Sequence, residues 1–363
     1  MRTWSVVVKY MVVVGVSCFL AYTISQMLAS ASELALPGMA TPALNNAGVC
    51  GKSQAVQTVP YKIESSLETW QDGPRMREVP VKVYFPVIRA GIKPATRFPV
   101  ILFSHGLGGT REGGQCWAAH WASHGFVVVA MQHAGSDEGL WMAVPPRDIA
   151  ISMKAGMTAS NLSLRVGDVH FVIDEVRRRT ERRAPAFVNA DPQRLGMSGH
   201  SFGAQTTLVV AGQKAAAGEG QSGLDSRVVA AIAFSPNARN KNNLVRQFDD
   251  IRMPFFSITG SQDASVLGDV TAAADRRLPY ENMPAGQKYL AVFDGGDHMV
   301  FGGHGLANRR PETPRDKKIQ QDVMSGTLAF WNAYLNQDAA SRLWLDEDGF
   351  RSTMAGNDIF EHK

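Results

Sequence analysis

The chain has 363 residues, of which 45% are hydrophobic and 19% are charged, and its formal net charge is +4 at pH 7. This length is enough for one large domain or two small ones, and the composition is that of an ordinary globular protein. The small net charge argues against a nucleic-acid partner.

The N-terminus differs from the rest of the chain. Arg2 and Lys9 supply positive charge, residues 11–21 are strongly apolar, and the small-residue pattern Ala-Ser-Ala ends at position 31. Together they predict a secretory signal peptide over residues 1–31. A retained anchor is the alternative, but the apolar run, which begins at Val6, is broken by Lys9 and is short for a membrane span. We therefore expect a secreted or periplasmic protein with no stable membrane anchor after cleavage.

From residue 56 onward, predicted strands alternate with predicted helices, after a loose lead-in over residues 32–55 that is rich in Ala, Gly, Asn and Pro. Continuous apolar strands between amphipathic helices predict a mostly parallel central sheet with helices on both faces. The less regular stretch 134–160 is expected to form a small insertion or cap, and residues 56–363 are expected to form one domain. In chain order the predicted elements are strand 77–85, strand 100–104, helix 116–124, strand 126–131, helix 162–179, strand 195–197, helix 204–210, strands 228–234, 255–259 and 289–293, of which 289–293 is the last, and helix 322–335.

Cys116 allows several interpretations. After cleavage it and Cys50 are the remaining cysteines, and in an oxidising compartment they could pair, although a buried thiol explains Cys116 equally well. Cys116, His120 and His124 also recur every four residues, so they share one face of the predicted helix. Three such ligands could hold zinc, but no fourth ligand and no H-E-x-x-H pattern accompany them. Helix packing is the favoured explanation, and no metal or cofactor is expected.

Residues 199–203 read Gly-His-Ser-Phe-Gly, which is the G-x-S-x-G pattern. An apolar strand precedes them and an apolar helical segment follows, so the pattern predicts a sharp strand–turn–helix elbow that lifts the Ser201 hydroxyl clear of the sheet. The flanking glycines are expected because a Cβ there would collide with the neighbouring strand and helix. Ser201 is therefore the predicted nucleophile.

A serine hydroxyl needs a base to take its proton, and that base needs an orienting carboxylate. On this type of sheet the partners follow in the order Ser, Asp or Glu, His. Asp263 lies a few residues after the strand 255–259, and His298 follows the strand 289–293. They are the predicted orienting acid and general base. Asp297 and Asp294 are competing acids, but Asp297 adjoins His298 too closely and Asp294 is expected to cap its loop.

The oxyanion of a tetrahedral intermediate needs hydrogen-bond donors. Residues 104–109, Ser-His-Gly-Leu-Gly-Gly, follow a strand and have the glycines that let backbone N–H groups turn inward. We expect the N–H groups of Leu107 and Phe202 to form the oxyanion hole, and His105 to brace this loop by hydrogen bonds.

The expected acyl pocket is small. Leu107, Phe202 and Met299 are predicted to border it, and His200, Trp141, Met142 and Met299 are predicted to line the wider substrate pocket.

These residues together resemble the α/β-hydrolase superfamily, across roughly residues 60–345. Within it the chain is similar to dienelactone-hydrolase-like and platelet-activating-factor-acetylhydrolase-like esterases, with cutinase-like polyester hydrolases as further relatives. The resemblance implies an α/β-hydrolase fold and ester hydrolysis. Ser201 stands where dienelactone hydrolases have a cysteine, which favours carboxylic esters. Polyester hydrolases usually have a tryptophan after the strand that follows the elbow helix, and here Phe234-Ser235-Pro236-Asn237 has none.

The main hypothesis is therefore a serine esterase (EC 3.1.1) that acts through an acyl-enzyme on short-chain esters. A polyester, lipid or acetylated-polysaccharide hydrolase is the first alternative, and a non-catalytic binding protein of the same fold is less favoured. The expected partner is a small-molecule or polymeric ester, and the sequence leaves the oligomeric state open.

Overall fold

The computed structural model describes residues 61–88, 97–214, 223–238, 240–265, 271–303 and 311–363. The predicted signal peptide, the lead-in and Cys50 lie outside these residues. Within the described ranges, no helix has both the length and the apolar character that a membrane span requires.

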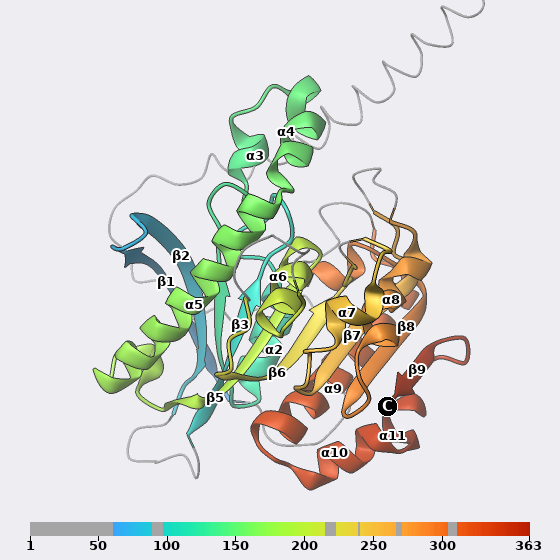
Figure 1. The fold of residues 1–363 in the computed structure, drawn as a ribbon. Helices are drawn as coiled ribbons and strands as arrows, with labels where there is room; N and C mark the ends of the chain where they lie inside the picture. The colour runs from blue at the N-terminus through green and yellow to red at the C-terminus, as the bar shows by residue number, and fades with distance from the viewer. Residues whose placement is uncertain (1–60, 89–96, 215–222, 239, 266–270, 304–310) are drawn as a thin grey trace, which may run out of the picture.

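Within the residues that the structure describes, nine strands form one mixed sheet in the order β1-β2-β4-β3-β5-β6-β7-β8-β9 (Figure 1). Every pair from β4 through β3 and β5 to β8 is parallel, whereas β1, β2 and β9 join the two edges antiparallel. The predicted fold class, an α/β-hydrolase fold with a mostly parallel sheet, is confirmed. The strands are β1 (Ile63–Asp72), β2 (Arg77–Pro86), β3 (Phe98–Ser104), β4 (Val127–Met131), β5 (Ala190–His200), β6 (Val228–Phe234), β7 (Phe255–Gln262), β8 (Lys288–Asp297) and β9 (Ile359–His362).

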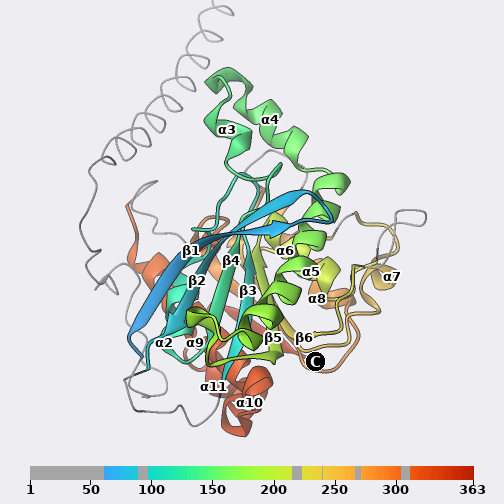
Figure 2. The same ribbon diagram turned by 90° about the vertical axis from the view of Figure 1, so that its left-hand side faces the viewer.

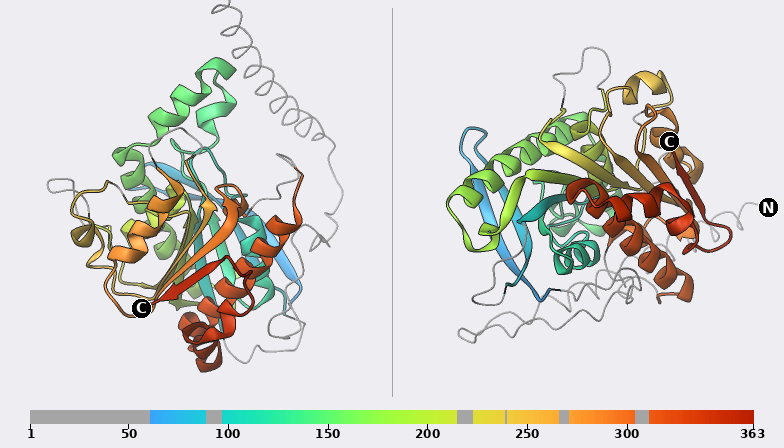
Figure 3. Two further views of the ribbon diagram at one scale, coloured as in Figure 1. Left: turned by 90° about the vertical axis from the view of Figure 1, so that its right-hand side faces the viewer. Right: turned by 90° about the horizontal axis from the view of Figure 1, so that it is seen from below.

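Helices cover both faces of the sheet. Seen from below in Figure 3, α5 and α6 lie on one side of the strands, and α2 and α9 lie on the other. The helices are α2 (Gln115–Ser123), α3 (Gly139–Met142), α4 (Ile149–Gly156), α5 (Ala159–Glu181), α6 (Phe202–Val210), α7 (Leu244–Phe248), α8 (Leu278–Asn282), α9 (Pro314–Leu335), α10 (Ala339–Asp346) and α11 (Asp348–Arg351), with 3-10 turns η1 (Pro146–Asp148), η2 (Pro185–Phe187), η3 (Ala273–Arg277) and η4 (Val300–Gly302).

The core has two halves because successive side chains of a strand point to opposite faces. In β3, Val100 and Leu102 pack into the apolar cluster beneath α5 and α6, whereas Ile101 and Phe103 pack into the cluster beneath α2 and α9. Every residue of β3 is buried, which explains its continuous apolar sequence. This two-sided burial holds the carboxyl ends of the parallel strands in fixed positions at one edge of the sheet.

The edge strands differ from the sequence-based prediction. β1 was not predicted, and the prediction that 289–293 is the last strand is wrong because β9 pairs with β8. β1 has polar residues along most of its length and buries only Trp70 and Asp72, so it lacks the apolar run by which central strands are recognised. β9 has four residues, none of them buried. Both are held by backbone pairing to a neighbouring strand.

The stretch 134–160 contains α3, η1 and α4 and leads into α5. In Figures 1 and 2, α3 and α4 project beyond the carboxyl-terminal edge of the sheet. The insertion is tied to the 104–109 loop, since Trp141 Nε1 donates to the Gly108 carbonyl at 2.7 Å and the Glu138 N–H donates to the Gly109 carbonyl at 3.1 Å. It therefore lies at the edge where the predicted site residues gather.

Candidate active site

Ser201 occupies a strained turn between β5 and α6. Its φ is 56° and its ψ is −114°, a conformation that L-residues rarely adopt. The turn is tight: a Cβ on Gly203 would lie 1.9 Å from the Ser104 carbonyl oxygen, and one on Gly199 would lie 2.4 Å from the Gly203 carbonyl oxygen. Only glycine fits at either position, as the sequence pattern requires. The strain is the kind that functional sites hold in place through their surroundings.

The structure brings Ser201, His298 and Asp263 together in one hydrogen-bonded chain. His298 Nε2 lies 3.0 Å from Ser201 Oγ, and His298 Nδ1 lies 2.7 Å from Asp263 Oδ1. Since a carboxylate accepts hydrogen bonds, Nδ1 carries the proton and Nε2 is left to accept from the serine hydroxyl. This is the arrangement in which an imidazole takes the proton of a nucleophile.

The Asp263 carboxylate is fully buried and is held by groups that the sequence did not reveal. Thr259, four residues earlier on β7, donates its hydroxyl to Asp263 Oδ2 at 2.8 Å. Arg276 of η3 lies on the other side. Its Nε donates to the Asp263 backbone carbonyl at 3.1 Å and lies 3.4 Å from Asp263 Oδ1. Arg276 Nη1 also donates to the Ser235 carbonyl at 2.9 Å. The carboxylate thus faces one imidazole, one hydroxyl and one guanidinium.

The competing acids have other contacts. Asp297 Oδ1 accepts the backbone N–H groups of Met299 and Val300, each at 3.0 Å, which fixes the turn that follows His298. Asp294 Oδ1 accepts the Ser261 hydroxyl at 3.0 Å. Neither arrangement brings the carboxylate to the ring of His298, so Asp263 is the acid that contacts it.

The predicted oxyanion donors flank the serine. Phe202 is the first residue of α6, so its N–H has no carbonyl one turn earlier in the helix to receive it. A Cβ on Gly106 would lie 3.5 Å from Ser201 Cβ, which places the 104–109 loop against the nucleophile. Among the described residues, the N–H groups of Leu107 and Phe202 donate to no other protein group. Both are available to a ligand beside Ser201.

The predicted pocket residues have different environments. His200 is buried, and its Nε2 lies 2.9 Å from the His298 backbone carbonyl, so its ring supports the loop that bears the base. Trp141 is half-buried against Gly108, and Met299 is half-buried beside His298. Met142 is 65% exposed on the projecting insertion. Of the four, His200 packs against the base itself, with its ring centre 4.7 Å from that of His298, whereas Met142 points away from the core.

Cys116 and His120 lie on α2, whereas His124 is the residue that ends the helix and has a non-helical backbone. His124 Nδ1 donates to the His120 carbonyl at 2.8 Å. Burial is the main cause that lowers the pKa of His120 to about 3, and the nearby His124 ring lowers it further. In the part of the chain that the structure describes, no three His, Cys, Asp or Glu side chains converge as a metal site would require. Trp117 and Trp121 of the same helix are fully buried in the core.

Comparison with known families adds an independent observation. Residues 76–141 match the family described as platelet-activating factor acetylhydrolase, isoform II. Over that segment the chain is similar to this family. The segment runs from β2 through the 104–109 loop, α2 and β4 to Trp141, so it includes the predicted oxyanion loop. The family implies an esterase, or more broadly a hydrolase. No curated protein matches the chain.

Proposed function

We propose that this protein is a serine esterase that hydrolyses carboxylic esters through an acyl-enzyme on Ser201. The observation that carries the proposal is the hydrogen-bonded chain from Ser201 through His298 to Asp263, next to the two available N–H groups of Leu107 and Phe202. A nucleophile, a base with its orienting acid, and an oxyanion hole are the parts that acyl transfer requires.

The steps follow from the geometry. Ser201 Oγ attacks the ester carbonyl while His298 Nε2 takes its proton, and the carbonyl oxygen becomes an oxyanion between the two N–H groups. As the ester C–O bond breaks, His298 returns the proton to the leaving alcohol, which leaves the acyl group on Ser201. Water then attacks the acyl-enzyme with the same base, and the released products are the acid and free Ser201. Asp263 stays ionised and stabilises the imidazolium at both stages.

The proposal extends to short acyl groups. Trp141 is a bulky side chain held against Gly108 of the oxyanion loop, and Met299 is a half-buried side chain next to His298 in the sequence. The name of the matched family describes an acetylhydrolase, which removes a two-carbon acyl group. We therefore expect acetyl and butyryl esters to react faster than long-chain esters.

A series of p-nitrophenyl esters from acetyl to palmitoyl, run with Ser201→Ala and His298→Ala, tests the proposal. We expect turnover by the wild type, a loss of at least ~10³-fold in kcat in each variant, and the highest kcat/KM for the short acyl chains. Undiminished turnover by Ser201→Ala would contradict the serine mechanism. Faster turnover of palmitoyl than of butyryl esters would contradict only the acyl-size part.

We also propose that the protein is exported, on the basis of the charge, apolar run and small-residue pattern in residues 1–31. Expression of the full chain followed by N-terminal sequencing of the exported protein checks this, with cleavage after Ala31 expected. Full-length protein that stays in the cytoplasm would contradict it.

A further inference from the structure

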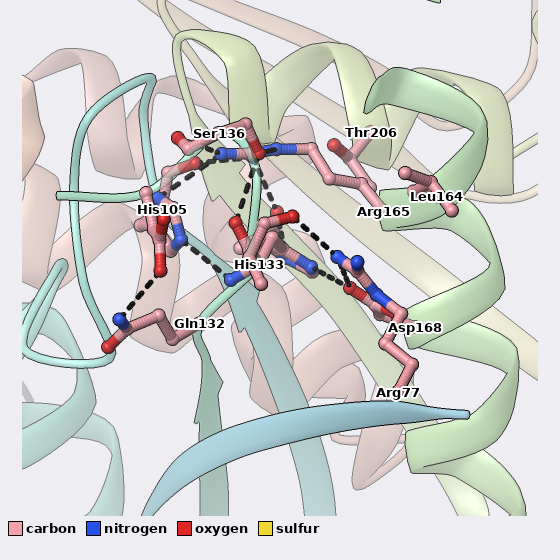
Figure 4. A network of polar contacts seen from close by, with 12 residues as sticks. Arg77, His105, Gln132, His133, Ser136, Leu164, Arg165, Asp168 and Thr206 are labelled. Carbon is pink, nitrogen blue, oxygen red and sulfur yellow. Dashed lines mark hydrogen bonds and ion pairs between the residues drawn. The ribbon is translucent and has the colours of Figure 1, made fainter. Parts of the chain in front are cut away.

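A buried arginine lies beside the oxyanion loop. Arg165 projects from α5 toward this loop, and its side chain has no exposure to solvent (Figure 4). A guanidinium has five N–H groups, and each one here has an acceptor. Nε donates to Ser136 Oγ at 2.8 Å, Nη1 donates to the His105 carbonyl at 2.7 Å and to Ser104 Oγ at 3.3 Å, and Nη2 donates to the carbonyls of Gly106 and Ser136, both at 3.4 Å.

These five acceptors are all neutral, and every one is a backbone carbonyl or a hydroxyl of residues 104–106 or of Ser136. Ser136 in turn is fixed to the same loop, since its carbonyl accepts the Gly108 N–H at 2.9 Å. An arginine in a surface ion pair binds one carboxylate and stays in contact with solvent, whereas Arg165 is buried and binds several neutral groups of the loop. The guanidinium therefore connects the oxyanion loop to the first residues of the insertion.

The Gly106 carbonyl links Arg165 to the oxyanion hole. This carbonyl and the Leu107 N–H belong to one planar trans peptide unit, so they point in opposite directions. The carbonyl also accepts from His105 Nδ1 at 2.6 Å and from the Gly109 N–H at 3.1 Å. Three donors on the carbonyl side set the plane of the peptide and hence the direction of its N–H. They also polarise the amide, which strengthens that N–H as a donor.

The protonation of His105 is set by its neighbours. The backbone N–H of His133 donates to His105 Nε2 at 3.0 Å, so that nitrogen carries no proton and Nδ1 carries the ring proton. His105 Nδ1 is then a donor to Gly106, as the contact requires. The ring thus braces the loop, which is the role predicted for His105 from the sequence.

The second oxyanion donor contacts the same guanidinium. Arg165 Cζ lies 4.5 Å from the centre of the Phe202 ring, which is 5% exposed. A cation over a desolvated aromatic ring is attracted by its π face. Phe202 is the residue that contributes the other N–H, so one arginine contacts both halves of the hole.

A buried polar network holds Arg165 itself in place. The Ser104 hydroxyl donates to His133 Nε2 at 2.9 Å, and His133 Nδ1 donates to Asp168 at 3.0 Å. Burial, and then the charge of Arg165, lower the pKa of His133 to about 4, so this ring is neutral at pH 7. Burial also lowers the pKa of Arg165 to about 9, and the guanidinium therefore stays charged at neutral pH. Arg77 joins the network at its far end, where its Nε donates to Asp168 at 2.7 Å.

We propose that Arg165 is a positioning residue of the oxyanion hole, which fixes the N–H groups of Leu107 and Phe202 toward the oxyanion that forms beside Ser201. The proposal rests on the proposed esterase function, because the oxyanion that these N–H groups would hold is the one formed in that acyl transfer. It goes beyond that function in assigning a role to a residue outside the triad and outside the hole.

The test compares Arg165→Met with Arg179→Met. Arg179 is a matched control because it lies on the same helix, and its Cζ also lies 4.5 Å from an aromatic ring, that of Trp70, away from the active site. For each variant, kcat and KM for p-nitrophenyl butyrate are divided by the number of Ser201 sites that react with a fluorophosphonate. We expect kcat of Arg165→Met to fall ~10²-fold with KM within about twofold, because displaced oxyanion donors weaken transition-state binding alone. Arg179→Met should keep the wild-type kcat.

Chemical rescue separates positioning from general destabilisation. In Arg165→Ala, added guanidinium chloride at millimolar concentration should restore part of the lost kcat, and the same concentration of ammonium chloride should not, because only the planar fork reaches the separate acceptors. Arg165→Lys should be impaired about tenfold, since it keeps the charge and loses the fork.

Three results would overturn the inference. They are a kcat of Arg165→Met within twofold of wild type per reactive site, an equal loss in Arg179→Met, and equal rescue by ammonium and guanidinium. If Arg165→Met does not fold, Ser136→Ala decides, with a fall of a few fold in kcat expected and an unchanged kcat overturning the inference. A wild-type protein that hydrolyses no ester and does not react at Ser201 would remove the proposed function as well, whereas an active wild type with unaffected Arg165 variants would remove only this inference.

Discussion

Thr259 gives the sharpest structural prediction within the triad. Its hydroxyl donates to Asp263 Oδ2 at 2.8 Å, and both residues are fully buried. Thr259→Val replaces that hydroxyl by a methyl group of nearly the same shape, so packing is preserved and one hydrogen bond is removed. The carboxylate oxygen then loses the side-chain donor that held it.

The magnitude follows from that loss. A hydrogen bond to a charged group contributes about 1.5–3 kcal/mol, and a buried acceptor left without a donor carries its full desolvation cost. We expect the free energy of unfolding to fall by about 2 kcal/mol. A less firmly held carboxylate orients His298 less well, and a loss of about 1.4 kcal/mol in the transition state lowers kcat about tenfold. Thr259→Ser, which keeps the hydroxyl, should retain most of the activity.

The assay combines urea unfolding with kcat and KM for p-nitrophenyl butyrate. Thr327→Val in α9 is the control, because Thr327 is also fully buried and donates its hydroxyl, to the Val323 carbonyl at 2.7 Å, but contacts no triad residue. It should lose stability and keep its kcat. A Thr259→Val protein with wild-type kcat would refute the reasoning, as would an equal loss of kcat in Thr327→Val.

Three further predictions concern the elbow, the buried network and the insertion. Gly203→Ala places a Cβ 1.9 Å from the Ser104 carbonyl oxygen, so the elbow must shift, and we expect kcat to fall ~10²-fold or the protein to be recovered unfolded; soluble protein with wild-type kcat would contradict this. His133 has a pKa of about 4 in the folded protein against 6.5 for a free histidine, so the unfolded chain takes up a proton first as the pH falls, and stability is lost from pH 6.5 down to about 4. The wild type should therefore lose more unfolding free energy than His133→Gln when the pH is lowered from about 7.5 to about 5, by about 2 kcal/mol as measured by urea unfolding. An equal loss in the two proteins would contradict the burial argument. Trp141→Phe removes the hydrogen bond to Gly108 and should lower kcat/KM for butyryl esters several-fold while leaving the melting temperature within a few degrees, whereas unchanged kinetics would place Trp141 outside the site.

The sequence was sufficient for the central strands. β6 was predicted at residues 228–234, the bounds that the structure has, because seven apolar residues lie between turn signals. β5 was predicted only in part, since residues 191–194 lack an apolar run and only Ala190 and Asp191 of the first five residues pair with β3. α9 begins at Pro314 rather than at 322. Thr313 and Asp316 form a capping box at its start, and the first turn of the helix lacks the apolar face that would have marked it in the sequence. Local pattern therefore locates buried elements and misses those held by a partner strand or a cap.

The same limit applies to the site. Chain order and strand ends were enough to name Ser201, Asp263 and His298, because this sheet brings the carboxyl ends of β5, β7 and β8 to one edge. Arg276 and Arg165 were not identified, since their partners lie on other elements and no local motif marks them. An arginine in a helix is ordinarily a solvated residue, and only the three-dimensional packing shows that these two are buried.

The central claim is that Ser201 carries the acyl group. The most direct measurement is mass spectrometry of the protein quenched during turnover of p-nitrophenyl butyrate, followed by peptide mapping. The account predicts a butyryl group on the peptide that contains Ser201 in the wild type and none in Ser201→Ala. Steady turnover with an unmodified Ser201, or a butyryl group on another residue whose replacement abolishes activity, would contradict it.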